Sequence, residues 1–128
     1  MIMKKLRYIY LFLFSLFAFS SCEKDYQSSA VMEITEPVSF SADVLPILVE
    51  DCATPNCHVP GGPSPDLSAS VAYDQLTQLG MVDTTNAEAS ILYKRMTETA
   101  KPMPPSGKLP PDEIAYILAW IEQGAQNN

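Results

Sequence analysis

The seven-residue segment from Cys52 to His58, Cys-Ala-Thr-Pro-Asn-Cys-His, constrains this chain more than any other part of its sequence. It holds two of the three cysteines and the only histidine among the 128 residues. A Cys-x-x-Cys-His run is typical of covalent c-type haem attachment, in which two thiols bind the haem vinyl groups and the histidine ligates the iron. Here four residues separate Cys52 from Cys57 instead of two, while Cys57 and His58 stay adjacent.

The longer gap changes the backbone path between the two cysteines. Residues five positions apart do not share a helical face, so the residues between them must bulge. Pro55 lacks an N–H group and pushes Thr54 out of the helical region, and Asn56 tolerates a left-handed backbone. We therefore expect a bulged loop that keeps a haem site geometrically possible.

A disulfide between Cys52 and Cys57 is the main alternative for this segment. Closing so short a loop stabilises a fold by roughly 2 kcal/mol in the chain-entropy model, and an oxidising compartment permits it. Zinc and iron–sulfur sites fit less well, because they require about four Cys or His ligands and the segment offers only three such groups. The segment by itself leaves the haem and the disulfide open.

Residues 1–21 have the pattern of a signal peptide. Lys4, Lys5 and Arg7 precede an apolar run from residue 8 to 19 that is short for a membrane span. Small residues then precede Cys22, an arrangement that resembles a bacterial lipoprotein signal, cleaved before a cysteine that carries lipid. The alternatives are an ordinary secretory signal and an N-terminal anchor helix. All three place the remainder of the chain outside the cytoplasm. The lipoprotein interpretation places it in the cell envelope, anchored to a membrane and facing the periplasm or the cell surface.

Composition divides the remaining chain and restricts its partners. Residues 22–37 are polar and acidic without periodicity, which predicts a flexible tether, and residues 38–128 form the expected domain. Removing the three basic residues of the leader from eight leaves five against fifteen acidic ones, a net charge of −10. This charge excludes nucleic acid as an expected partner and favours partners with positive faces, although solubility alone also explains it.

The apolar periodicity predicts helices and therefore an all-α fold. The first expected helix covers residues 41–51, with Asp43 as its N-cap, and leads directly into Cys52. The second covers residues 69–79 and ends at Gly80. Its inward side chains are expected to be Val71, Leu76 and Leu79.

Two further helices are expected after residue 84. Thr85 and Glu88 form a capping box for a helix that runs to about Met96, with Ile91, Leu92 and Met96 on its buried face. The last helix opens at the two prolines of 110–111 and ends near Gly124. Its apolar stripe and the neighbouring aromatic residue are expected in the core: Ile114, Ile117, Leu118, Ile121 and Trp120.

Two proline-rich loops complete the candidate site. The loop of residues 60–65 presents carbonyl groups, one of which can accept the ring N–H of His58, although such a loop is equally typical of a surface connection. In the loop of residues 101–107, Met103 lies between prolines, so its thioether is held on a stiff extended segment, as an axial ligand requires. The alternative for Met103 is a hydrophobic plug, and Met81 is a weaker competitor for the ligand role.

Six motifs in order resemble the planctomycete-type cytochrome c family from about residue 40 to 125. They are Asp-Val-x-Pro-Ile-Leu, Cys-His with its Gly/Pro loop, Ala-Tyr-Asp-x-Leu, Ser-Ile-Leu-Tyr, Met-Pro-Pro-x-Gly and Trp-Ile-x-x-Gly-Ala. The resemblance implies a small cytochrome c-like all-α domain wrapped around one covalent haem c, with its terminal helices packed across each other. It also implies that Cys52 and Cys57 bind the haem, that His58 is the proximal ligand and that Met103 is the distal one.

These features together predict a lipid-anchored electron carrier that is not an enzyme. Two axial side chains leave the iron no open position for a substrate. The expected partners are an unidentified redox protein and, through the lipid on Cys22, a membrane. The alternative from another class is a haem-free lipoprotein binding module stapled by a Cys52–Cys57 disulfide. A neighbouring alternative is a haem domain that serves as a redox sensor or as an accessory of a larger complex.

Overall fold

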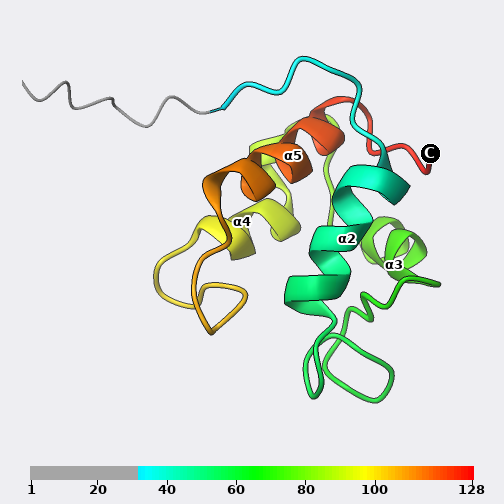
Figure 1. Cartoon of the computed structure of the whole chain (residues 1–128), viewed down its shortest axis with the longest axis vertical. Coiled ribbons are helices and arrows are strands. Elements are labelled where there is room, and N and C mark those ends of the chain that lie inside the picture. The colour runs from blue at the N-terminus through cyan, green and yellow to red at the C-terminus, as the bar shows by residue number, and fades with distance from the viewer. Residues whose placement is uncertain (1–31) are drawn as a thin grey trace, which may run out of the picture.

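The computed structural model describes residues 32–128, and within this range every regular element is a helix (Figure 1). The all-α prediction is therefore confirmed for this part of the chain. The predicted signal peptide, Cys22 and the first part of the tether lie outside the described residues. In chain order the elements are η1 (Phe40–Val44), α2 (Leu45–Ile47), η2 (Leu48–Cys52), α3 (Ala72–Gln78), η3 (Ala87–Ala89), α4 (Ile91–Thr97) and α5 (Pro111–Glu122).

The first three elements form one continuous composite helix, residues 40–52, whose two ends are wound as π-helix. Its hydrogen bonds include Val44 N to Ser39 O, at 3.3 Å, and Ala53 N to Leu48 O, at 2.8 Å, both of which span five residues. The proline at position 46 lies inside this helix and has no N–H group. Widened turns on both sides of a proline relieve the clash of its ring with the preceding carbonyl, and thus keep the helix continuous.

The N-cap of the composite helix is Ser39, so the prediction of Asp43 as N-cap is wrong. The Ser39 hydroxyl accepts a hydrogen bond from Ala42 N at 3.3 Å, while the Asp43 carboxylate reaches back to Ser39 N at 2.7 Å. An N-cap at Asp43 would place Pro46 in the first turn, where the backbone N–H groups make no hydrogen bond within the helix. The π-helical winding removes that requirement, and the helix begins earlier.

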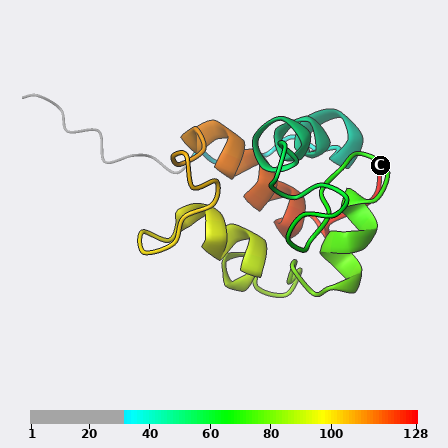
Figure 2. The same ribbon diagram turned by 90° about the horizontal axis from the view of Figure 1, so that it is seen from below.

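The composite helix and α5 lie side by side (Figure 2), and in the core between them three aromatic rings meet. The ring of Phe40 stands 5.2 Å from Trp120 and 5.3 Å from Tyr73, in tilted and edge-on arrangements. Trp120 is 1% exposed, as the prediction of a core role required. Such aromatic pairs contribute about 0.5–1.5 kcal/mol beyond their buried area. The first and last helices are thus packed together.

Helix α3 is shorter than predicted and ends in a Schellman motif. Met81 N donates to Leu76 O at 2.9 Å and Gly80 N donates to Thr77 O at 3.2 Å, with Gly80 at a φ of 63°. Gly80 is therefore the helix terminator that the sequence predicts. Leu79 becomes the C-cap residue and is 45% exposed, so its predicted inward orientation is wrong.

The predicted capping box at Thr85 is wrong, and the helix begins five residues later, with Ser90 in place of Thr85 as its N-cap. Asp83 Oδ1 accepts hydrogen bonds from Thr85 N at 2.9 Å and from the Thr85 hydroxyl at 2.6 Å, which leaves that hydroxyl engaged in an Asx turn. Asn86 caps the short η3 instead, and α4 starts at Ile91. Met96 is buried as predicted, whereas Ile91 is 46% exposed because the helix starts in a different register.

Helix α5 follows its prediction closely. Pro111 is its first residue, Gly124 adopts a φ of 97°, and Ala125 N donates to Trp120 O at 2.9 Å behind it. Most of the predicted stripe is buried, namely Ile117, Leu118 and Ile121, and Ile114 packs on the core from its edge. None of the described helices is long and apolar enough to span a bilayer.

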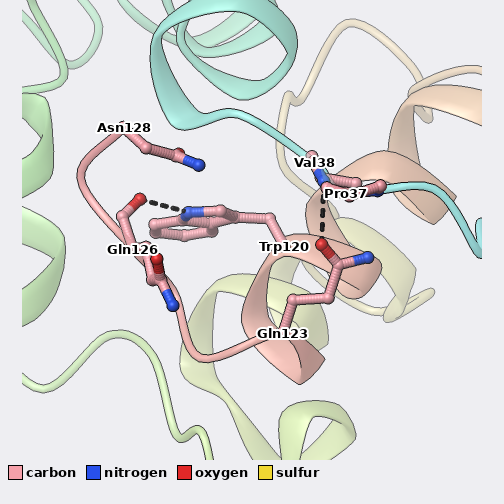
Figure 3. Close-up of a pocket in the computed structure, with 6 residues that line it drawn as sticks. All are labelled: Pro37, Val38, Trp120, Gln123, Gln126 and Asn128. Atoms are coloured by element: carbon pink, nitrogen blue, oxygen red, sulfur yellow. Dashed lines mark hydrogen bonds between the residues drawn. The ribbon is translucent and has the colours of Figure 1, made fainter.

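The segment after α5 returns to the start of the composite helix and supplies its missing hydrogen-bond acceptors. Asn128 Oδ1 accepts from Phe40 N at 2.8 Å, and Asn128 O accepts from Ser41 N at 2.9 Å. A pocket of about 120 Å³ lies beside Trp120, next to this contact, and Figure 3 shows the residues that line it. The pocket contains none of the predicted site residues, since it is lined by Pro37, Val38, Trp120, Gln123, Gln126 and Asn128.

Replacing Asn128 by alanine should destabilise the fold through this contact. The Phe40 N–H would lose its acceptor, and an unmade hydrogen bond of this kind costs about 1 kcal/mol. For a domain of this size that corresponds to a fall in the melting temperature of about 4–8 °C. Thermal unfolding followed by circular dichroism measures it, with Asn127→Ala as the matched control, because Asn127 is exposed. Equal melting temperatures for the two variants would contradict the capping role.

Candidate functional site

The four residues between Cys52 and Cys57 form an exposed turn, as the sequence predicts. Cys57 N donates to Thr54 O at 2.9 Å, which closes the turn around Pro55 and Asn56. Asn56 has a φ of 67°, the left-handed conformation that asparagine tolerates better than most residues. The two extra residues are therefore accommodated outside the helix.

This turn brings His58 back beside Cys52. The backbone N–H of His58 donates to the carbonyl of Cys52 at 3.1 Å, directly after the last π-helical hydrogen bond of the composite helix. This hydrogen bond fixes the position of His58 relative to the end of the composite helix. The longer gap thus leaves the first cysteine and the histidine adjacent in space.

The ring of His58 is held by the proline-rich loop that follows it. Its Nδ1 atom lies 2.9 Å from the carbonyl oxygen of Pro65 and 3.2 Å from that of Pro63. Carbonyl oxygens only accept hydrogen bonds, so in the neutral ring these contacts assign the proton to Nδ1 and the lone pair to Nε2. The prediction that this loop supplies an acceptor for the His58 ring is confirmed. A ring held in this tautomer is prepared to ligate a metal through Nε2.

Gly62 is required where the loop turns back on the motif. A Cβ atom at this position would collide with the backbone carbonyl of Cys57. The turn is closed by Gly62 N donating to Val59 O at 2.8 Å, and the loop ends where Leu67 N donates to His58 O at 2.8 Å. Since Leu67 is buried in the core, the loop is anchored at both ends.

The two thiols differ in their surroundings. Both cysteines are free and partly buried, and Cys52 packs against the core at the end of the composite helix. Burial, followed by the charges of Asp51, Cys57 and Glu113, raises the pKa of the Cys52 thiol to about 11. The Cys52 thiol is therefore protonated at neutral pH.

Glu113 is a neighbour of Cys52 that the sequence reasoning missed. It lies in the first turn of α5, and its Oε2 atom is buried without a hydrogen-bond partner. Burial raises the pKa of Glu113, and the nearby carboxylates of Asp51, Asp112 and Glu50 raise it further. In the sequence, Glu113 is explained by the preference of acidic residues for the first turn of a helix. Nothing in the sequence indicates that it lies close to Cys52.

Met103 lies on the loop between α4 and α5 and is partly buried. Its backbone N–H donates to Arg95 O at 2.8 Å, which ties the loop to the end of α4. No hydrogen bond joins this loop to the Cys52–His58 segment within residues 32–128. Both loops leave the helical body on its lower side in Figure 1. Of the competing methionines, Met96 is buried in the core and Met81 is partly buried at its edge.

The described residues contain no group of three or more His, Cys, Asp or Glu side chains that converge to hold a metal ion. Comparison with protein-family models, with curated proteins and with solved structures found no match to this chain. The chemistry of the site therefore has to be argued from its own residues.

Glu113→Gln should stabilise the protein at neutral pH and have little effect in acid. The raised pKa of Glu113 means that the folded chain favours its protonated form, so stability falls as pH rises through that pKa. The amide of glutamine does not ionise, so the variant does not lose this stability as pH rises. Melting temperatures at about pH 4 and about pH 7 measure the difference, because an ordinary carboxyl titrates near pH 4.3. The control is Glu33→Gln, an exposed carboxylate. A variant that is less stable than the native protein at neutral pH would contradict the assignment.

Proposed function

We propose that this chain is an exported, lipid-anchored c-type cytochrome that carries single electrons through a His/Met-ligated haem c. The observation that carries the proposal is the anchoring of the His58 ring. Two carbonyl groups hold Nδ1, at 2.9 and 3.2 Å, and leave Nε2 as the ligating atom. Histidines that ligate a metal almost always donate their other ring N–H to such an acceptor.

The residues around His58 fit a covalently attached haem. Two free thiols flank the turn, and the backbone N–H of His58 donates a hydrogen bond to the carbonyl of Cys52. Gly62 lets the loop pass close to the Cys57 carbonyl. A haem c bound at such a site supplies one-electron exchange between ferrous and ferric iron.

The proposal assigns each site residue a separate role. Cys52 and Cys57 hold the haem covalently, His58 is the proximal iron ligand and Met103 is the distal one. A thioether ligand favours ferrous iron and therefore raises the reduction potential. Because both axial positions are filled by side chains, a substrate finds no open coordination site, which is why we propose a carrier and not an enzyme.

A cytochrome c-like fold and membrane anchoring complete the proposal. A chain of about 60–100 residues buries only about 60% of its unfolded surface. An apolar cofactor would add to a core that otherwise rests largely on the contacts of α5. The proposed lipid on Cys22 would keep the domain at a membrane while residues 22–37 give it reach. An unidentified redox protein is then the proposed partner.

The proposal is tested by expressing the full chain together with a haem-maturation system. We expect a red protein whose absorbance survives acid–acetone extraction, because thioether bonds retain the haem. His58→Ala should abolish the low-spin spectrum, since the chain has no other histidine. Ser64→Ala, an exposed loop residue, is the matched control. A colourless protein in which Cys52 and Cys57 form a disulfide would support the haem-free binding module instead.

Met103→Ala should lower the reduction potential and open one iron position to carbon monoxide. Met96→Ala should instead cost about 2–5 kcal/mol of stability as a core truncation and leave ligation unchanged. The near-infrared methionine-to-iron band of the ferric protein separates the two variants. Loss of this band in Met96→Ala or Met81→Ala, with its persistence in Met103→Ala, would show that Met103 is not the distal ligand.

A further inference from the structure

The charged side chains of the domain are separated by sign along the chain. Residues 32–128 contain four basic and thirteen acidic residues, and all four basic ones lie between positions 94 and 108. Only one acidic residue lies in that stretch. The rest of the described chain therefore has twelve acidic residues and no lysine or arginine. We call Lys94, Arg95, Lys101 and Lys108 the basic strip.

The fold keeps the basic strip together around Met103. Lys94 and Arg95 lie in the last turn of α4, and Lys101 and Lys108 lie on the loop that follows. The hydrogen bond from Met103 N to Arg95 O holds the loop against this helix end. In both views the segment from residue 94 to 108 projects on the side opposite α3 (Figures 1 and 2).

The cations of the strip are available to a partner. All four side chains are exposed, and the single ion pair among the described residues joins Arg95 to Glu98 at 2.7 Å. Arg95 itself is 49% exposed in this pair, so solvent screens most of that interaction. The three lysines form no ion pair within residues 32–128.

The neighbouring surface fits a protein better than a membrane. Ile91, one turn before Lys94 and Arg95, is 46% exposed and supplies an apolar contact beside the cations. An apolar centre with a charged rim is the usual composition of a protein–protein interface. Insertion into a bilayer requires several large apolar side chains on one face, and residues 94–108 expose none.

We propose that the basic strip is the docking face through which an electron-transfer partner with an acidic surface reaches the site. The inference rests on the proposed function and adds the kind of partner and the face that it uses. The net charge of the chain favours partners with positive faces at long range. At contact distance the cations of the basic strip determine whether the partner is attracted, because screening limits interactions between exposed charges to about 10 Å at 0.1 M salt.

The test measures electron exchange with hexacyanoferrate(III), a small anionic oxidant. Each ion takes one electron from the ferrous protein and leaves it ferric, and no proton moves. If the strip guides the encounter, the rate constant falls as ionic strength rises from about 0.1 M to about 1 M, where the Debye length shrinks from about 10 to about 3 Å and salt screens the local cations. If net charge governs instead, the rate constant rises over the same range, which overturns the proposal.

Matched variants separate the strip from total charge. Lys101→Gln with Lys108→Gln removes two positive charges and should lower the rate constant at about 0.1 M ionic strength at least about threefold. Ser70→Glu with Gln78→Glu makes the same net change at exposed positions on the α3 side and should have a smaller effect. Equal effects of the two pairs overturn the proposal. Lys101→Arg with Lys108→Arg keeps the charge and should keep the native rate constant. A lower rate constant in this variant would show that the lysines have only a structural role and would overturn the proposal.

A vesicle experiment distinguishes a protein partner from a membrane. Residues 22–128 with Cys22→Ser, the chain left after removal of the predicted signal peptide, are sedimented with phosphatidylcholine–phosphatidylglycerol vesicles, and we expect them to stay in the supernatant. Binding that disappears in the Lys101→Gln, Lys108→Gln variant would assign the strip to anionic lipid and overturn the protein-docking proposal. Failure of the proposed function is a separate result, because a chain without haem is colourless before any exchange is measured.

Discussion

Two hydrogen bonds to His58 determine how this small chain is built around its candidate site. One joins the His58 backbone to the Cys52 carbonyl, and the other holds the His58 ring against the Pro65 carbonyl. The first fixes the histidine to the end of a rigid helix, and the second orients its ring. Because both acceptors are backbone groups, the arrangement depends on the chain path and not on further polar side chains.

The helical body supports these bonds through packing. The composite helix leads from the aromatic cluster of Phe40 and Trp120 to Cys52, so the motif begins at a point fixed by the core. Widened turns carry this helix past its internal proline. At the other end of the motif, the buried Leu67 returns the loop to the same core. The histidine is therefore held from two sides, by its hydrogen bond to Cys52 and by the loop that ends at Leu67.

Much of the local structure could be predicted from the sequence because it depends on near neighbours. The left-handed Asn56, the terminators Gly80 and Gly124 and the start of α5 at Pro111 all follow from backbone preferences. The predictions failed where one side chain had two possible partners. Thr85 could cap a helix, but Asp83 engages it first. Asp43 could be an N-cap, but Ser39 takes that role once the helix tolerates an internal proline.

The sequence by itself determined which residues are candidates for the site, since the adjacent Cys57 and His58 and the proline-flanked Met103 are features of the chain order. Only the tertiary structure decided which backbone carbonyls hold the His58 ring and that Glu113, 61 positions along the chain, lies close enough to raise the pKa of Cys52. It also decided that the loop of Met103 is tied to α4, which gathers the basic residues on one side. Preferences of the backbone act over a few neighbouring residues. The contacts of His58 and Met103 depend on how whole loops fold back over seven and eight positions, and that of Glu113 with Cys52 forms only when the helices pack.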